Sequence, residues 1–262
     1  MPKKAKTPRP PRPVQAPQRR DARQRNGNRL AGAGGVPRWV WLVGIAVVAA
    51  IVAAVIALTG GSGKASAAKV KQTMLAAGCT YEDMKPLPPK TKSYGGYHAD
   101  VPTLTKSMNG LWNTFPPAAG GHYPLWAVWG FYTQPVNPRQ VVHNEEHGAV
   151  VIWWGPKVPA STVAKLRAFY NEPIPGGAGD GMFGTPLVAK INGKSLGDKI
   201  ALTSWTGDPT HYYEAGDYGV GHVAICPSFN ENAFKTFRDA YRGHGPEGIP
   251  LADDEPGMGP TS

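Results

Sequence analysis

The sequence predicts a single-pass membrane protein with one N-terminal transmembrane helix followed by a single extracytoplasmic α+β domain. Three observations support this prediction. An uncharged, proline-free apolar run covers residues 39–59, and ~20 such residues are enough to cross a bilayer as a helix. About 200 residues follow it, enough for one domain with its own core. Helical and strand patterns do not alternate strictly there, which favours α+β over a doubly wound sheet.

Residues 1–36 form a basic tail that we expect to be disordered and cytoplasmic. Residues 1–38 hold eleven of the 28 lysines and arginines but only one of the 18 acidic residues, so they carry the whole net charge of +10. A segment without apolar periodicity cannot bury enough surface to offset its ordering entropy. The tail would suit weak adhesion to anionic lipid or RNA, but a topology signal is the simpler interpretation. The remaining chain is neutral and gives no electrostatic argument for nucleic-acid binding by the folded domain.

Residues 37–59 contain the predicted transmembrane helix. Trp39 and Trp41 stand near its start, where aromatic belts lie, and Arg38 marks the boundary. Because the basic side is N-terminal, the positive-inside rule places the tail in the cytoplasm and the C-terminal domain outside the cell membrane. A cleavable signal peptide is the competing interpretation, since residues 65–67 (Ala-Ser-Ala) resemble a cleavage site. The apolar run is longer than the ~7–15 residues of a signal peptide, which favours an uncleaved anchor.

The rest of the chain divides into a connector, a domain and a tail. Residues 60–74 read as a flexible linker and a short helix, and the helical pattern stops at Gly78. Residues 75–250 form the histidine-rich extracytoplasmic domain, in which residues 86–117 are too rich in Pro and Gly to predict regular structure. Residues 251–262 read as a loose C-terminal tail.

The second half of the domain carries the more regular patterns. Apolar, β-branched runs predict strands, and apolar residues spaced three or four apart predict helices. The predicted strands are residues 149–154, 187–191 and 200–205, and the predicted helices are residues 159–171 and 228–241. Ser161 is the expected N-cap of the first helix.

The only two cysteines, Cys79 and Cys226, are expected to form a disulfide. Two cysteines in one domain on the oxidising side of a membrane usually pair. A redox or metal-binding pair of thiols is the alternative, but the chain contains no C-x-x-C motif.

The chemistry of the sequence is concentrated in residues 137–148. His143 and His147 stand four apart, with Glu146 just before the second histidine. Asn137 and Pro138 suit the start of a short helix, and Gly148 suits its end. A helix would place both histidines on one face, at a spacing typical of two ligands to one metal. The rival local interpretation ends a strand at His143 and makes the following residues a turn.

Two further histidines, His98 and His122, lie in turn-rich segments and could complete a metal site. Three or four imidazoles would suit zinc or copper. Met182 could add a soft ligand and favour copper, although methionine more often fills a core. The alternative is that the histidines only hydrogen-bond within loops, with Glu146 holding one tautomer.

The order of motifs from residue 115 onward resembles a family of bacterial membrane-anchored domains of unknown function. Its signature runs P-P-x-S-G-x-H-Y, then G-x-Y, then V-H-x-L-E-H-G and a hydrophobic strand. The matching positions are Pro116, Pro117, Gly120, His122, Tyr123, Gly130, Tyr132, Val142, His143, Glu146, His147 and Gly148. Ala119 and Glu145 depart from that signature, which has Ser and Leu there. His98, residues 201–205 and residues 237–247, which end in Pro246 and Glu247, also resemble elements of the family's pattern. The resemblance covers roughly residues 75–250 and implies a membrane anchor and a site at these histidines, but no reaction.

We therefore expect an extracytoplasmic domain with a histidine-rich site that binds zinc or copper. One alternative is a metal-dependent hydrolase with Glu146 or Glu145 as general base. The H-x-x-E-H spacing also occurs in inverzincin metalloproteases. Those enzymes need a longer active-site helix than Pro138 and Gly148 permit. The other alternative is a non-catalytic cell-envelope interaction domain with structural histidines.

Overall fold

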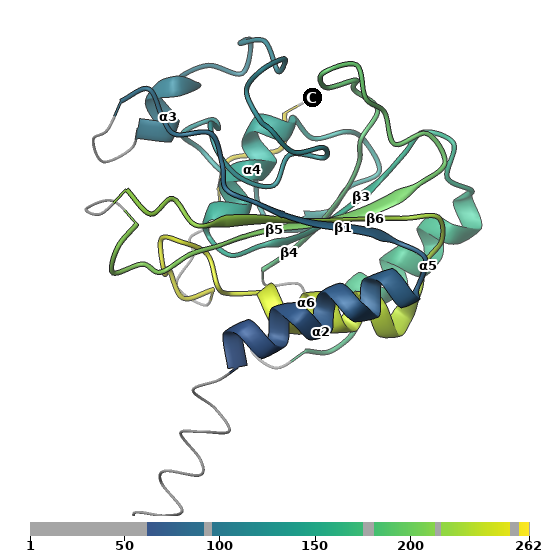
Figure 1. Cartoon of the computed structure of the whole chain (residues 1–262). Helices are drawn as coiled ribbons and strands as arrows, with labels where there is room; N and C mark the ends of the chain where they lie inside the picture. The colour runs from purple at the N-terminus through teal and green to yellow at the C-terminus, as the bar shows by residue number, and fades with distance from the viewer. Residues whose placement is uncertain (1–61, 92–95, 175–180, 213–215, 252–256, 262) are drawn as a thin grey trace, which may run out of the picture. The chain divides into compact units, whose positions relative to one another are not determined.

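The computed structural model describes residues 62–91, 96–174, 181–212, 216–251 and 257–261, with side chains from residue 67 onward. These residues form an α+β domain around a mixed six-stranded sheet, as predicted (Figure 1). The basic tail, residues 1–36, and the predicted transmembrane helix, residues 37–59, lie outside the described residues. Within the described residues, no helix is long and apolar enough to cross a membrane.

The sheet is antiparallel along one side and parallel along the other. In spatial order its strands are β1 (Thr80–Met84), β6 (Val220–Cys226), β5 (Ile200–Thr206), β3 (Val150–Trp154), β4 (Met182–Pro186) and β2 (Gly130–Phe131). The pairings from β1 through β3 are antiparallel, whereas β3–β4 and β4–β2 are parallel. Strands β3 and β5 are central, and β3, which is buried on both faces, reads as a continuous apolar run.

Alternation along the central strands divides the core into two apolar clusters. In β3, Val150 and Ile152 belong to one cluster, whereas Val151 and Trp153 belong to the other. Successive side chains of a strand point to opposite faces of a sheet. The two clusters therefore lie on opposite faces, and β3 is buried on both.

One face of the sheet is covered by three helices, α2 (Ser62–Ala76), α5 (Ala160–Tyr170) and α6 (Glu231–Tyr241), drawn along the lower side of Figure 1. Helix α6 buries Phe234 and Phe237, and α2 buries Met74 against the same cluster. This face is closed by apolar side chains, and we call it the helical face.

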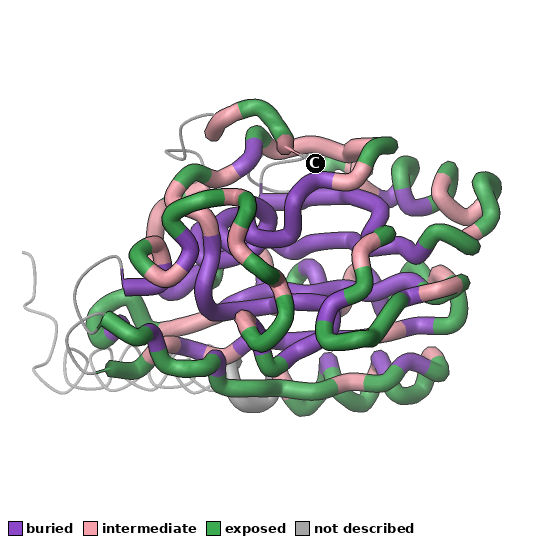
Figure 2. Tube along the Cα trace, turned by 90° about the horizontal axis from the view of Figure 1, so that it is seen from above, coloured by how far each residue is buried: buried purple, intermediate pink, exposed green. Residues whose placement is uncertain are grey.

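The opposite face is covered by the short helices α3 (Gly96–Asp100) and α4 (Pro138–Glu146) together with long loops (Figure 1). We call it the loop face. Figure 2 looks down on this side and shows the buried part of the trace running through the middle, with exposed loops at the rim. The loops bury Trp112 and Tyr212 and pack around α4, so this face is closed even though it has little regular structure.

A disulfide joins Cys79 to Cys226, as predicted. Cys79 lies between α2 and β1, and Cys226 ends β6. The bond therefore ties the first strand of the sheet to the strand beside it, across 147 residues of sequence. Both sulfurs are buried in the cluster of the helical face.

The prediction of a strand at residues 187–191 is wrong. The strand is β4, Met182–Pro186, which pairs in parallel with β3 through residues that include a glycine and a proline. Those residues have low strand propensity by themselves. Residues beyond Leu187 instead enter a turn, in which Asn192 has a φ of 51° and Ile191 bridges to Lys194. Burial in the centre of the sheet, rather than local propensity, determines where β4 lies.

Strands β1 and β6 had no predicted counterpart. Most of β1 is exposed, and two of its five residues are acidic, because it forms an edge of the sheet. Strand β6 contains a glycine and a histidine within its apolar run. Both strands form through antiparallel pairing with neighbours that are distant in sequence.

Two element ends also differ from expectation. Helix α5 has Pro159 at its N-cap, so Ser161 lies inside the helix and the N-cap prediction is wrong. Proline fits there because its fixed φ and missing N–H suit a helix start. The predicted helix 228–241 begins at Glu231, where the side chain of Asn230 accepts from the Ala233 N–H at 3.0 Å.

Residues 257–261 are not loose, although the sequence suggested a loose tail. Met258 bridges to Ala127, and the Thr261 N–H and hydroxyl both donate to Gln140 Oε1. The segment is therefore held against α4 and the loop before it. The bridge between Met258 and Ala127 is a backbone pairing, which does not depend on side-chain type, so composition gave no sign of it.

Candidate metal centre

Helix α4 is a polar helix in a fully buried position. The side chain of Asn137 accepts from the Arg139 N–H, Pro138 occupies the first turn, and His147 is the C-cap. Gly148 follows with a φ of 93°, and a side chain there would meet the backbone of residues 243 and 245 at 3.0 Å. Of the two local interpretations, the helix is correct. All nine residues of α4 are buried.

The buried face of α4 presents His143, Glu146 and His147 to one another. The Nε2 atoms of His143 and His147 lie 3.0 Å apart, and His143 Nε2 lies 3.9 Å from Glu146 Oε2. All three side chains have at most 3 % of their surface exposed. One helical turn therefore gathers three potential ligands, as the spacing in the sequence predicted.

The loop face brings two more histidines to the same place. His122 Nε2 lies 3.0 Å from Glu146 Oε2, and His98 Nε2, on α3, lies 3.4 Å from the same oxygen. His122 is completely buried, whereas His98 keeps 26 % of its side chain exposed. The four histidines and Glu146 thus form one cluster, and His98 is its most exposed member.

The backbone fixes which nitrogen of two histidines faces the cluster. His122 Nδ1 donates to the Gly120 carbonyl at 2.7 Å, and His143 Nδ1 donates to the Tyr123 carbonyl at 2.8 Å. A carbonyl oxygen only accepts, so both Nδ1 atoms carry a proton. In the neutral rings, Nε2 then presents a lone pair to the centre, as it does in histidines that ligate metals.

Three ligand atoms at the centre have no hydrogen-bond partner. They are His98 Nε2, His122 Nε2 and Glu146 Oε2, which are buried and point at one another. Buried polar atoms without partners are uncommon, and each requires a physical explanation. A cation held between the three atoms would supply one, because each would then donate its lone pair to the ion.

The carboxylate of Glu146 is held in place by its other oxygen. Tyr212 donates its hydroxyl to Glu146 Oε1 in a short hydrogen bond, which leaves Oε2 for the centre. Burial by itself raises the pKa of Glu146, but the surrounding histidines, His122 foremost, outweigh burial and hold that pKa well below its usual value. Glu146 is therefore ionised at neutral pH.

His143 is held in its uncharged form. Burial, reinforced by His122, lowers the pKa of His143 well below its usual value, although Glu146 opposes the shift. The imidazole is therefore neutral at neutral pH, which is the form that binds metal ions.

The spacing of the ligand atoms suits a transition-metal ion. Four ligands at ~2.0–2.1 Å from a tetrahedral zinc ion stand roughly 3.3–3.4 Å apart. The distances of 3.0, 3.4 and 3.9 Å around Glu146 Oε2 bracket that value. Two groups of four residues have all their ligand atoms within 4.8 Å of one another. One comprises His98, His122, His143 and Glu146, and the other comprises His143, Glu146, His147 and Glu247.

A family model described as "Protein of unknown function (DUF3105)" matches residues 110–252. The match covers more than half of the 262 residues. The chain belongs to the DUF3105 family. No curated protein and no solved structure matches the chain. The matched region begins later than the resemblance noted from the sequence, so His98 lies outside it and the other cluster residues lie inside it.

Within the DUF3105 domain, Glu247 is the cluster residue that was not a predicted ligand, although it ends the segment that resembles the family's closing helix. Its Oε2 lies 3.1 Å from His147 Nε2, and its side chain is 11 % exposed. Glu247 follows α6 in an irregular, Gly- and Pro-rich segment, about 100 residues after His147. No local spacing links the two residues, so only the fold could reveal their contact.

Two other expected participants lie outside the cluster. Glu145 receives a short hydrogen bond from Thr203 on β5, and burial raises its pKa well above the usual value even though that hydrogen bond acts in the opposite direction. Met182 lies in β4 within the apolar cluster of the helical face. The DUF3105 sheet therefore separates Met182 from the histidines, and its role is core packing.

Aromatic rings surround the cluster and limit access of water. Trp126 packs against His143 and His147, with ring centroids 5.3 and 4.5 Å away. Trp205 packs edge-on against His122, at 5.9 Å. A low-dielectric shell of this kind strengthens electrostatic interactions between an ion and its ligands.

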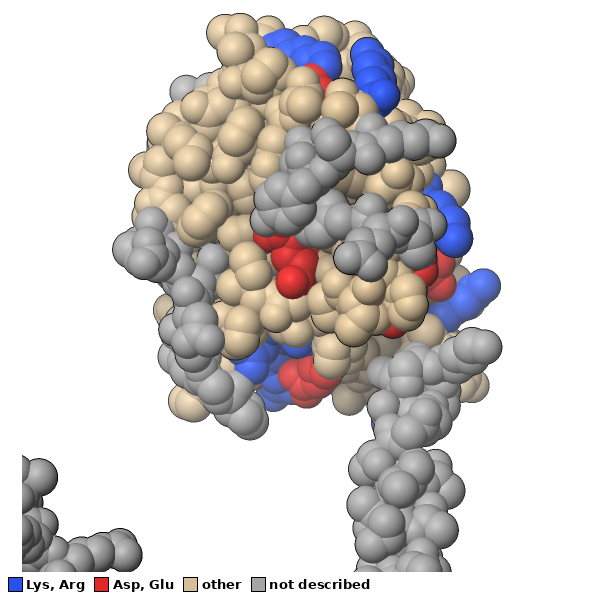
Figure 3. Space-filling view, turned by 90° about the vertical axis from the view of Figure 1, so that its left-hand side faces the viewer, with Lys and Arg blue, Asp and Glu red and all other residues tan. Residues whose placement is uncertain are grey.

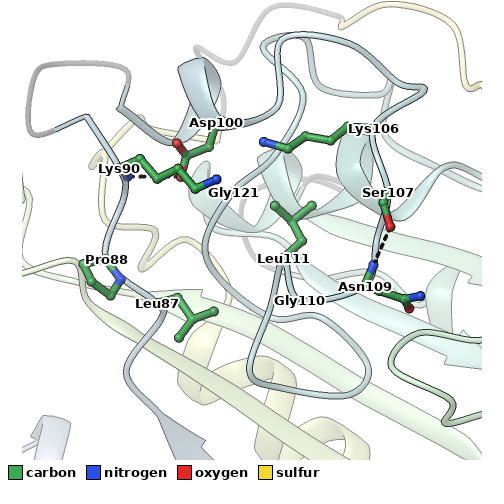
Figure 4. A pocket seen from close by; sticks show the side chains of 10 residues that line it. All are labelled: Leu87, Pro88, Lys90, Asp100, Lys106, Ser107, Asn109, Gly110, Leu111 and Gly121. Atoms are coloured by element: carbon green, nitrogen blue, oxygen red, sulfur yellow. Dashed lines mark hydrogen bonds between the residues drawn. The ribbon is translucent and has the colours of Figure 1, made fainter.

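A pocket of about 220 Å³ adjoins the loops that hold the cluster (Figure 4). Asp100 and Gly121 line it and lie close in sequence to two of the histidines, but none of the ligand candidates lines it. Lys90 and Lys106 reach into the pocket in Figure 4, so its lining is net positive.

The three remaining histidines lie elsewhere. His222 is buried between Asp83 and Thr206, with ring nitrogens 2.6 and 2.7 Å from their side-chain oxygens. His211 is exposed and contacts Asp208, and His244 is exposed in the loop after α6.

Proposed function

We propose that this domain binds a transition metal, zinc or copper, at the cluster formed by His98, His122, His143, His147 and Glu146. The observation that carries the proposal is the set of buried ligand atoms without hydrogen-bond partners at the centre of the cluster. Imidazole and carboxylate together suit zinc and copper better than the hard cations that prefer oxygen ligands alone.

Hydrogen bonds within the protein hold several ligand side chains in position, and these bonds do not require a bound ion. The carbonyls of Gly120 and Tyr123 orient two imidazoles, and Tyr212 orients Glu146. Such partners of the ligands set the tautomer and raise ligand basicity. A bound ion would supply positive charge and Lewis acidity at this point.

The geometry favours metal binding over hydrolysis with a glutamate as general base. Glu145 points to Thr203, outside the cluster. Glu146 uses one oxygen for Tyr212 and turns the other to the histidines, as a ligand does. A general base needs an oxygen within hydrogen-bond reach of a substrate or a water molecule.

We also propose that the domain is anchored in the cell membrane by residues 37–59 and lies on the extracytoplasmic side. The support comes from the uncharged apolar run and the basic segment before it. The disulfide adds support, because such bonds persist in oxidising compartments.

Metal analysis of the purified full-length chain tests the proposed binding. We expect bound zinc or copper, and we expect His122→Ala to weaken its affinity by more than about 100-fold, since changes to the partners of ligands alone cost 10- to 100-fold. His211→Ala is the matched control, because His211 is exposed and outside the cluster. A chain that binds neither metal, or a His122→Ala variant with unchanged affinity, would contradict the proposal.

Protease treatment of intact cells or spheroplasts tests the topology. We expect the C-terminal domain to be digested, because the predicted anchor places it outside. Protection of that domain in intact cells, with digestion only after lysis, would reverse the proposed orientation.

A further inference from the structure

The six carboxylate and histidine side chains of the cluster are too spread out to serve one ion. Among the described residues, their ligand atoms form two overlapping groups of four and not one group of six. His98 and His122 belong only to the first group, whereas His147 and Glu247 belong only to the second.

Hydrogen bonds leave His143 and Glu146, the two residues shared by both groups, with one ligand atom each. His143 Nδ1 donates to the Tyr123 carbonyl, so only its Nε2 is left for an ion. Glu146 Oε1 accepts from Tyr212, so only its Oε2 faces the cluster. Each shared residue therefore offers a single ligand atom.

The shortest distances assign the two shared residues to different groups. His143 Nε2 lies 3.0 Å from His147 Nε2 but 3.9 Å from Glu146 Oε2. Glu146 Oε2 lies 3.0 and 3.4 Å from the two histidines of the first group. The cluster thus separates into two triplets, each with two histidines and one glutamate. They are His98, His122 and Glu146, and His143, His147 and Glu247.

We infer that the domain binds two metal ions, one in each triplet. Three protein ligands leave a coordination position open, as in catalytic rather than structural zinc sites. Each triplet also has one partly exposed member, since His98 is 26 % and Glu247 11 % exposed. The inference rests on the proposed metal binding and adds the second ion and the role of Glu247.

Metal stoichiometry of the full-length chain tests the inference. The chain is stripped with chelator, loaded separately with Zn²⁺ and with Cu⁺, desalted, and measured by mass spectrometry of metal against protein. We expect two ions per wild-type chain with at least one of these metals. We expect one ion per chain in Glu247→Gln, which removes a ligand of the second triplet, and one in His98→Gln, which removes a ligand of the first.

Glu231→Gln is the matched control for the loss of a carboxylate. Glu231 is exposed at the start of α6, on the helical face, and pairs with Lys235. This variant should keep two ions. Circular dichroism of each variant confirms that the fold is retained, and both substituted ligands are partly exposed and keep their approximate size.

The outcomes separate the two claims. A wild-type chain that binds one ion, variants that keep two ions, or single variants that lose both ions would each overturn the inference while leaving metal binding intact. A wild-type chain that binds no Zn²⁺ and no Cu⁺ would instead overturn the proposed function.

Discussion

The two faces of the sheet are closed by different means. On the helical face, α6 buries Phe234 and Phe237 at a three-residue spacing, and Arg238 is its only buried polar residue. On the loop face, α4 is entirely buried, and most of its side chains are polar or charged. The same strands supply both faces, because alternate residues point in opposite directions.

The helical face therefore contributes mainly to stability, whereas the loop face holds the candidate metal ligands. Apolar burial stabilises the helical face by about 25 cal/mol per Å² and needs no particular partner. Each buried polar atom on the loop face instead needs a partner, and three at the centre have none in the protein. We therefore expect substitutions on the helical face to change stability, and substitutions in the cluster to change metal binding.

Truncation of a core phenylalanine should have the largest effect on stability. Phe234 is fully buried in α6, and Phe→Ala in a core costs about 3–5 kcal/mol. Urea unfolding of Phe234→Ala followed by circular dichroism should show this loss, and the folded variant should keep its metal content. Leu75→Ala, at a half-exposed position of α2, should change stability by less than about 0.5 kcal/mol. Equal losses in the two variants would contradict the importance we assign to this face.

Loss of the disulfide should rank next. Removal of a native disulfide typically costs about 2–5 kcal/mol, and loop-closure entropy predicts the upper part of that range for a loop of 147 residues. The double variant with Cys79→Ser and Cys226→Ser should have a lower midpoint of thermal unfolding than the wild type. Mass spectrometry of unreduced wild-type peptides should show the two cysteines linked, and two alkylatable thiols would contradict the bond.

Metal binding at the loop face should stabilise the folded domain as a whole. A ligand that binds only the folded state adds about 2.7 kcal/mol when its free concentration is 100 times Kd. Titration of Zn²⁺ during thermal unfolding should therefore raise the midpoint of wild type and Leu75→Ala alike. The increase should be smaller in His143→Ala, which removes a buried ligand candidate. An undiminished increase in that variant would place the ion elsewhere.

Acid should weaken a smaller polar network beside α6. Burial opposes ionisation of Asp83, but hydrogen bonds from His222 and Tyr81 outweigh it and lower the pKa of Asp83. A lowered folded-state pKa contributes stability above the unfolded value of 3.8, and this contribution is lost as pH falls through the folded value. Asp83→Asn should therefore lose up to about 1 kcal/mol at pH 7, with a smaller difference from wild type near pH 2, because Asp83 is 41 % exposed.

Glu82→Gln is the control for that experiment. Glu82 precedes Asp83 in β1 and is exposed, with no pairing to His222. Its stability should follow the wild type from pH 7 to pH 2. The interpretation fails if the two variants show the same pH dependence.

Helix capping should give the smallest effect. Asn230 caps α6 through a hydrogen bond to the Ala233 N–H, and replacing such a cap with alanine costs about 1 kcal/mol. Ser161 lies inside α5 and makes no cap. Asn230→Ala should thus lower the urea midpoint, whereas Ser161→Ala should leave it nearly unchanged. A larger loss in Ser161→Ala would restore Ser161 as a cap.

The helical face was the easier part to predict, although not in every detail. The apolar spacing in residues 228–241 located α6, and the run at residues 200–205 located β5. The same approach misplaced β4, because a strand that contains Gly184 and Pro186 looks like a turn in isolation. It also missed β1, whose exposed residues form a strand only because β6 lies beside them.

The loop face was predicted only where ligands share one helix. His143, Glu146 and His147 could be placed together because one turn of α4 spans their spacing. His98 and His122 were candidates by residue type, but nothing in the turn-rich segments determined where their rings would point. Glu247 was not a candidate at all, since it approaches His147 from a loop after the last helix.

The sequence by itself determined what depends on near neighbours: the periodicity of α5 and α6, the apolar central strands, the pairing of the only two cysteines, and the residue types of a metal site. Tertiary structure alone decided which strands pair and how many ligands meet. The physical reason is the distance along the chain over which each kind of interaction acts. Helical spacing, caps and strand alternation act over a few residues, whereas convergence of His98, Glu146 and Glu247 depends on how segments up to about 150 residues apart pack over one face of the sheet.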